Sequence, residues 1–173
     1  MFGSIESYNI SQIDDKLWLG NLNAAEDIQD LKRKGIKKIL SILTGYFPTY
    51  ERKDNFIHKK VDADDNDSQN IIQYFGECLN FINGEEKVLV HCGAGVSRSS
   101  SILIAFIMWK RKLNFEDAVN FVKEKRPFIW PNAGFREQLK IFGKKLVENN
   151  YNIDKIKFKE IKWEPPENIG LLL

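Results

Sequence analysis

Short apolar runs and longer mixed segments follow one another along this chain. Apolar runs typical of buried strands lie at 36–43, 56–61 and 87–91. Two further strands are predicted at 8–13 and 17–19, with Asp14-Asp15 as the turn between them. This pattern predicts a sheet whose later strands are separated by enough chain for crossover connections.

Helical spacing of apolar residues fills the intervals between these strands. The predicted helices cover 24–34, 71–82, 99–112, 114–125 and 134–149. Asn23 and Glu26 are placed like a capping box for the first helix, and Gly35 like its C-terminal glycine. The helix at 99–112 is apolar on nearly every side, which indicates a buried central element. Strands alternating with helices predict a single α/β domain over residues 1–149.

The remaining segment, residues 150–173, has a weaker pattern. Its apolar residues show partial alternation at Ile153, Ile156, Phe158, Ile161 and Trp163. Such alternation indicates either an edge strand or contact with a partner, and a loosely packed terminus is the plainer alternative.

Charge and cysteine content narrow the possible partners and compartments. The 26 basic residues nearly balance the 24 acidic ones, so net charge predicts no attraction to nucleic acid or to a membrane surface. The longest apolar run, 102–109, is too short to cross a bilayer, and the first residues lack the pattern of a secretion signal. Two cysteines and two histidines favour neither a disulfide framework nor a structural metal site. We therefore expect a reducing compartment, the cytoplasm or also the nucleus.

The segment His91-Cys92-Gly93-Ala94-Gly95-Val96-Ser97-Arg98 connects a predicted strand to a predicted helix. A loop at a helix N-terminus points several backbone N–H groups at one place, where the helix dipole adds positive potential. Gly93 and Gly95 permit a tight curve, and Arg98 supplies a planar, permanently charged fork for two phosphate oxygens. The predicted phosphate-binding residues are Gly93, Ala94, Gly95, Val96, Ser97 and Arg98.

Cys92 lies at the mouth of this predicted anion site. Positive potential favours thiolate over thiol, and a thiolate can attack phosphorus to form a covalent intermediate. Ser99 is placed to donate a hydrogen bond to the sulfur and help it leave. A lone cysteine is usually a small core residue, but the spacing C-x-x-G-x-x-R between strand and helix favours chemistry.

A leaving ester oxygen also needs a proton, for which an aspartic acid is a natural donor. The loop at 62–67 holds four aspartates, and the residues alone do not choose among Asp62, Asp64, Asp65 and Asp67. A solvated turn in which Asp67 or Ser68 caps the next helix accounts for part of this acidity.

Taken together, these segments resemble the dual-specificity phosphatases, a family within the cysteine-dependent protein tyrosine phosphatase superfamily. The resemblance covers about residues 8–147. Besides His91 to Ser99, it is carried by Leu17-Trp18-Leu19-Gly20-Asn21, Asp65-Asn66 ahead of Tyr74-Phe75, Arg126-Pro127, and Pro131-Asn132-Ala133-Gly134-Phe135.

The resemblance implies a central mixed, mostly parallel sheet flanked by helices, and a catalytic domain at 1–149. It implies Asp65 as general acid and later base, with Asp64 as the alternative and Asp62 as structural. His91 would orient the loop, and catalysis would be carried by Cys92 and Arg98 with no metal or organic cofactor. The expected substrates are phosphorylated proteins, taken by a monomer through a shallow pocket that accepts phosphotyrosine and phosphoserine/threonine.

Other functions within the superfamily fit less well. Phosphoinositide phosphatases tend to carry lysines in this loop, whereas Gly93, Ala94, Val96 and Ser97 are uncharged. RNA triphosphatases have a different loop, and glucan phosphatases carry a carbohydrate-binding module for which the chain has no room. A phosphoprotein-binding module without turnover is the alternative from another class, although Cys92 and the acidic loop argue against it.

The second cysteine, Cys78, lies on the apolar face of its predicted helix, together with Phe75 and Ile82. This position predicts a small core residue. A protective disulfide with Cys92 is the alternative, because catalytic cysteines of low pKa oxidise readily.

Overall fold

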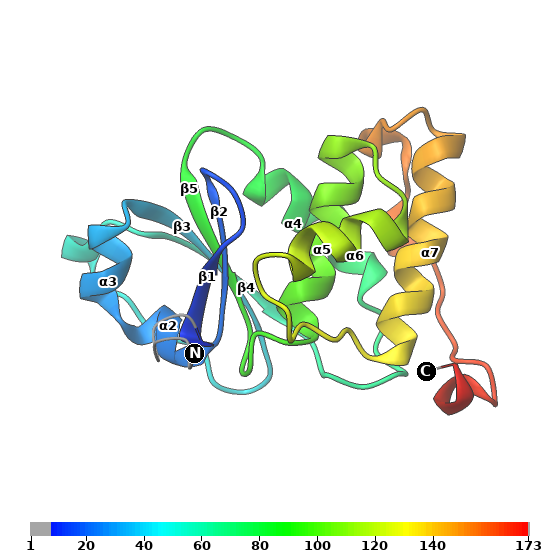
Figure 1. Ribbon diagram of the computed structural model, residues 1–173, viewed down its shortest axis with the longest axis horizontal. Helices are drawn as coiled ribbons and strands as arrows, with labels where there is room; N and C mark the ends of the chain where they lie inside the picture. Colours follow the sequence, from blue (N-terminus) through cyan, green and yellow to red (C-terminus); the bar gives the residue numbers. More distant parts are fainter. Residues whose placement is uncertain (1–7, 173) are drawn as a thin grey trace.

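The computed structural model describes residues 8–172 and contains one five-stranded sheet at its centre (Figure 1). The strands are β1 (Ile10–Gln12), β2 (Leu17–Gly20), β3 (Ile36–Leu43), β4 (Ile57–Asp62) and β5 (Lys87–His91). They lie in the order β1-β2-β5-β3-β4, and only β1 runs antiparallel to its neighbour. The predicted mixed, mostly parallel sheet is confirmed.

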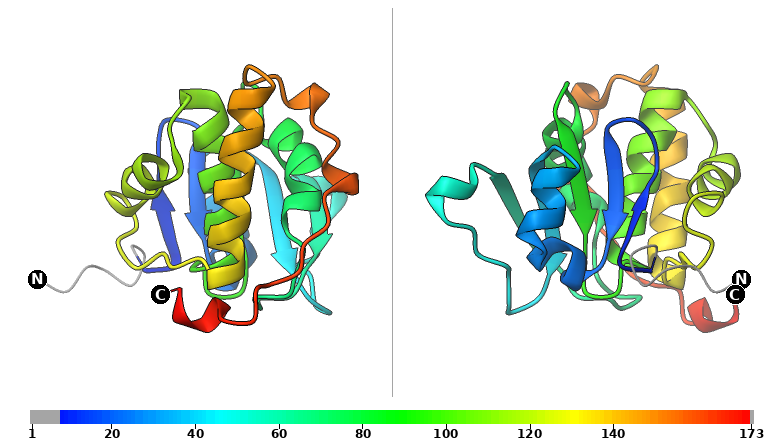
Figure 2. Two further views of the ribbon diagram at one scale, coloured as in Figure 1. Left: turned by 90° about the vertical axis from the view of Figure 1, so that its right-hand side faces the viewer. Right: turned by 60° about the vertical axis from the view of Figure 1, so that its left-hand side comes forward.

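Helices cover both faces of the sheet, unequally (Figures 1 and 2). Two short helices lie on one face: α2 (Leu22–Glu26) and α3 (Ile28–Arg33). The other face carries α4 (Phe75–Ile82), α5 (Arg98–Arg111), α6 (Phe115–Lys123) and α7 (Ala133–Glu148). Because both faces are covered, successive residues of the central strand β5 pack into different cores: Val88 and Val90 toward the larger helical layer, Leu89 toward the smaller.

The single helix predicted over 24–34 is wrong, because the chain forms two helices that part at Asp27. Asp27 leaves helical geometry with ψ 76°, and its side chain accepts a hydrogen bond from the backbone N–H of Asp30. Asn21, and not Asn23, caps the first helix by accepting from the N–H of Ala24. An aspartate that binds nearby backbone competes with helix continuation, which explains the break.

Of two other predicted helices, the one at 71–82 is divided in two and the one at 99–112 is confirmed. The region 71–82 consists of a 3-10 turn at Ile72–Tyr74 followed by α4. The backbone N–H groups of Ile71 and Ile72, at the start of this region, donate to the side-chain oxygen of Gln138. Helix α5 is buried from Ile102 to Met108 as predicted, and it forms the centre of the larger helical layer. No helix within residues 8–172 is both long and apolar enough to cross a membrane.

The segment after α7 contains no strand within residues 150–172, so the edge-strand alternative is wrong. It forms three short turns instead, η3 (Ile153–Lys155), η4 (Phe158–Glu160) and η5 (Ile169–Leu171). Ile153, Ile156 and Phe158 are buried in the core shared with the helical layer. The segment then runs along this layer back toward the end of the molecule where α7 begins (Figure 2). Contact with a partner remains a prediction.

Candidate active site

The loop that joins β5 to α5, residues 92–97, is the centre of the candidate site and is called here the Cys92 loop. Neighbouring segments, one after β2 and one between α6 and α7, support it at the carboxyl ends of the parallel strands. The N–H of Leu22, after β2, donates to the carbonyl of Gly93 at 3.1 Å, and the N–H of Trp130 donates to that of Val96 at 2.8 Å. This edge of the sheet is where α/β folds generally bind ligands.

The thiol of Cys92 has two polar neighbours, one inside the loop and one in the first turn of α5. The backbone N–H of Gly95 donates to Sγ at 3.3 Å, and the hydroxyl of Ser99 lies 3.1 Å from it. Cys92 is 2% exposed, and the sulfur sits at the N-terminal end of α5. Donors aimed at this point and a helix N-terminus together make a site that attracts an anion.

Gly95 occupies a position that no other residue fits. Its φ is +68°, and a Cβ built there would lie 2.6 Å from the carbonyl oxygen of Gly20 and 2.6 Å from a guanidinium nitrogen of Arg126. The glycine predicted from the motif is thus required both for the turn and for close contact with β2.

Arg126, which the sequence pattern marked only as part of a motif, lies fully buried beneath the Cys92 loop. Its Nε donates to the carbonyl of Gly95 at 2.9 Å, and its Nη1 donates to the hydroxyl of Ser11 at 3.0 Å. Burial lowers the pKa of Arg126 to about 10, so the side chain remains a cation at neutral pH. It therefore adds fixed positive charge near the thiol.

Arg98 begins α5 and turns its guanidinium back over the loop. Nη1 donates to the carbonyl of Ala63 at 3.2 Å, which ties the arginine to the segment after β4. Nη2 lies 3.4 Å from the position that a Cβ of Gly93 would take. The Nε atom is buried and has no partner among the described residues, so this donor is available to a bound oxyanion.

The segment after β4, residues 63–70, is called here the acid loop, and it brings one carboxylate to the Cys92 loop. Oδ1 of Asp65 accepts from the hydroxyl of Ser97 at 2.7 Å and from the side-chain amide of Asn132 at 2.9 Å. The other aspartates are engaged elsewhere. Asp64 accepts from Thr44 at 3.0 Å, and Asp67 accepts from the N–H of Gly134 at 3.1 Å.

Asn132 is a link that sequence reasoning did not assign. Besides holding Asp65, it caps α7 by accepting from the N–H of Phe135, and its own N–H donates to the hydroxyl of Ser97 at 3.0 Å. The position of an asparagine just ahead of an apolar helix was the available signal. The contact of Asn132 with Asp65 joins residues 67 positions apart, so no local sequence pattern indicates it.

His91 lies fully buried directly before the Cys92 loop. Its Nδ1 is 3.2 Å from the carbonyl oxygen of Cys92, and its Nε2 is 2.5 Å from the hydroxyl of Ser41, which also lies 2.8 Å from Nε2 of His58. Burial lowers the pKa of His91 to about 4, so the ring is neutral at physiological pH. The neutral ring has a polar contact at each of its two nitrogens, and the loop-orienting role expected for it stays a prediction.

Cys78 is a core residue, as predicted. It is fully buried on α4 among the apolar residues of the larger core, and its thiol is free. Burial raises the pKa of this thiol to about 12, which opposes thiolate formation. The protective disulfide with Cys92 is not formed in this structure.

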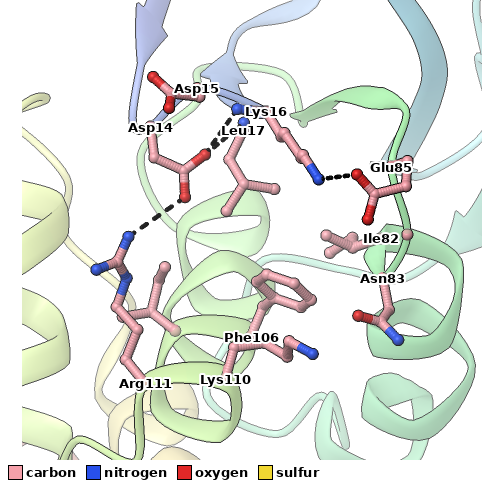
Figure 3. A pocket seen from close by; sticks show the side chains of 12 residues that line it. Asp14, Asp15, Lys16, Leu17, Ile82, Asn83, Glu85, Phe106, Lys110 and Arg111 are labelled. Carbon is pink, nitrogen blue, oxygen red and sulfur yellow. Dashed lines mark hydrogen bonds and ion pairs between the residues drawn. The ribbon is translucent and has the colours of Figure 1, made fainter.

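A hollow of about 580 Å³ lies near the C-terminal end of α5 (Figure 3). Two ion pairs lie in it, Arg111 with Asp14 at 3.6 Å and Lys16 with Glu85. None of the residues lining it belongs to the Cys92 loop or the acid loop. The residues of the candidate site therefore lie at the opposite, N-terminal end of α5, where Arg98 and Ser99 are found.

The fold and the Cys92 loop define the class, that of the cysteine-dependent protein tyrosine phosphatases. Residues 17–145 match the family model "Dual specificity phosphatase, catalytic domain", and the chain belongs to this family. It is 35% identical over 159 residues to Drosophila melanogaster dual specificity protein phosphatase MPK-4, covering 89% of this chain and 41% of that protein. It is 32% identical over 169 residues to Danio rerio dual specificity protein phosphatase 22-A, covering 95% and 79%.

Solved structures show the same fold. Human tyrosine phosphatase-like serine/threonine/tyrosine-interacting protein matches with a TM-score of 0.76 and 33% identity, over 81% of this chain and 99% of the other. DUSP15 matches with a TM-score of 0.75 and 30% identity, over 87% and 99%. The chain spans less than half of the length of MPK-4.

Proposed function

We propose that this protein hydrolyses phosphotyrosine and phosphoserine/threonine in proteins through a cysteinyl-phosphate intermediate. The observation that carries the proposal is the bond from Ser97 to Asp65, which puts a carboxyl group against the loop that bears Cys92. A nucleophile in a phosphate-binding loop and an acid held against that loop are the two groups that ester hydrolysis requires.

In the first step, the thiolate of Cys92 attacks phosphorus as the bond to the ester oxygen breaks. Protonated Asp65 gives its proton to the departing oxygen, so the alcohol leaves neutral. The guanidinium of Arg98 and the N–H groups of the loop stabilise charge on the three equatorial oxygens. The product is a phosphocysteine and a dephosphorylated side chain.

In the second step, water attacks phosphorus and the sulfur–phosphorus bond breaks. Asp65, now a carboxylate, takes a proton from the water, which restores the acid for the next turnover. Ser99 donates its hydroxyl proton in a hydrogen bond to the departing sulfur, and this bond stabilises the leaving thiolate. Inorganic phosphate is released, and no step requires a metal or an organic cofactor.

Replacement of the two cysteines tests the nucleophile. We expect Cys92→Ser to lower kcat on an aryl phosphate by at least about 1,000-fold, because an unactivated hydroxyl is a poor nucleophile. Cys78→Ala, at the buried cysteine away from the loop, should keep activity near wild type. A serine variant with full activity would refute the assignment of Cys92.

Two neighbouring aspartates provide a matched test of the acid. Asp65→Asn should lower kcat by about 100-fold or more on phenyl phosphate, whose leaving group needs a proton, and far less on an activated aryl phosphate. Asp64→Asn, which affects a carboxylate bound to Thr44, should change neither rate strongly. The reverse result would move the acid role to Asp64.

A binding module without turnover is the second candidate, because one structural neighbour is described as phosphatase-like and interacting. Single-turnover measurement with a phosphopeptide separates the two functions, since a module would bind the peptide and release no phosphate. The uncharged side chains at Ala94, Val96 and Ser97 favour protein substrates over phosphoinositides, and a matched panel of the two substrates tests that preference.

We further propose that the protein acts as a monomer in the cytoplasm, or also in the nucleus. The proposed chemistry needs Cys92 as a free thiolate, and a reducing compartment maintains it in that form. We propose phosphorylated proteins as the partners, with no role for nucleic acid or membrane.

A further inference from the structure

The segment that follows α7, residues 150–172, touches the acid loop at two points. The side-chain amide of Asn70 donates to the carbonyl of Ile161 at 2.8 Å. The indole N–H of Trp163 donates to the carbonyl of Asp67 at 2.8 Å. Both bonds span more than 90 residues of sequence, and both reach the loop that carries Asp65.

The start of α7 also holds this loop. The N–H of Gly134 donates to the carboxylate of Asp67 at 3.1 Å, and the fully buried amide of Gln138 donates to the carbonyl of Gln69 at 2.9 Å. Asp67 is thus bound through its side chain by α7 and through its carbonyl by Trp163. Its backbone lies only two residues from Asp65.

Trp163 can restrain the loop because the segment before it is firmly anchored. The ring of Phe158 is 7% exposed and packs on Gly76, where an added Cβ would come within 2.7 Å of it. The ring centroid of Phe142 on α7 lies 5.9 Å away, and Lys159 pairs with Glu77 at 3.0 Å. Trp163 follows Phe158 by five positions in the sequence.

We propose that Trp163 is a positioning residue for the general acid: its N–H fixes the Asp67 peptide and so holds Asp65 in place over the Cys92 loop. The proposal rests on the acid role of Asp65 given above. Proton transfer to a leaving oxygen depends on hydrogen-bond reach, so freedom in the acid loop reduces the fraction of encounters with the acid in place. Binding of the phosphate group involves other residues and is unaffected.

The chain offers a matched pair of tryptophans for the test. Trp163→Phe keeps an aromatic ring and removes only the N–H. Trp109→Phe removes an equivalent bond, 3.0 Å from its Nε1 to the carbonyl of Tyr151, at the far end of α5. Both variants of the full chain are assayed with phenyl phosphate and with an activated aryl phosphate.

We expect Trp163→Phe to lower kcat on phenyl phosphate about 3- to 10-fold, a modest share of the effect of losing the acid, with KM and the rate on the activated ester nearly unchanged. Trp109→Phe should lower neither rate selectively. In the Asp65→Asn background, Trp163→Phe should have no further effect, because no acid remains to be positioned.

Equal losses on both esters, or an unreduced effect of Trp163→Phe in the Asp65→Asn background, would show a general structural role and overturn the proposal. A silent Trp163→Phe beside a large, ester-dependent effect of Asp65→Asn would overturn it and leave the proposed acid intact. If Asp65→Asn itself shows no dependence on the leaving group, the acid role is refuted, and the positioning role with it.

Discussion

At the scale of single residues, the site depends on side chains and backbone positions that tolerate almost no change. Gly95 brings its backbone against the carbonyl of Gly20 and against Arg126, and its N–H donates to the sulfur of Cys92. The motif predicted a glycine at this point. It did not predict the buried arginine beneath it, whose partners come from chain segments 31 and 115 residues away.

Gly95→Ala should lower the free energy of unfolding by at least about 2 kcal/mol, because strain at positive φ adds to contact with backbone atoms. Urea denaturation measures this, and activity should fall with it. Gly45→Ala is the matched control: φ there is +77°, and a Cβ would meet nothing within 4 Å. This control should lose only about 1 kcal/mol. Equal losses at both positions would mean that the close contacts at Gly95 cost nothing.

At the scale of elements, the N-terminal end of α7 connects the two functional loops. Asn132 joins Asp65 to Ser97, while Gly134 lies against the backbone of Asp67.

The observed bounds of β3 and β5 agree with those predicted from the sequence. Both strands are buried on both faces, and a buried strand is recognisable as a continuous apolar run between turns. The break at Asp27 and the turns after residue 150 were missed, because each depends on a local polar bond or on tertiary packing that periodicity does not register.

Gly134→Ala tests this contact. An added Cβ would lie 2.2 Å from the carbonyl oxygen of Asp67, so the acid loop must move. We expect a stability loss of about 2 kcal/mol or more and a selective loss of turnover on phenyl phosphate. In Gly143→Ala on the same helix, the new Cβ would meet only the flexible end of Met108 at 3.0 Å. That variant should be neutral or slightly more stable, because alanine favours a helix. Parallel behaviour of the two variants would contradict this role for Gly134.

At the scale of the whole molecule, the two histidines of the chain make stability depend on pH. The pKa of His91 and that of His58 are each lowered to about 4, mainly by burial. Between pH 4 and 6.5 the unfolded chain therefore binds more protons than the folded one, and stability rises with pH. Above pH 6.5 this contribution is complete, and it is lost as the pH falls.

For His91 alone, lowering the pH from 7 to 5 should reduce the free energy of unfolding by about 2 kcal/mol. Denaturation curves at several pH values measure the slope. In His58→Gln, where one of the two rings no longer titrates, the slope should be shallower. A stability that stays flat between pH 5 and 7 would contradict the buried, neutral state of His91.

The position of β5 has a consequence for how activity arises during folding. This strand is the last of the five along the chain and the central one in the sheet, between β2 and β3. Before it inserts, the β1–β2 and β3–β4 pairs share no strand, and pairing across so many residues is intrinsically slow. Cys92 follows β5 directly, so the thiol site cannot exist in either half alone. Recovery of catalysis on refolding should therefore coincide with the closing of the sheet, and partly folded chains should be inactive.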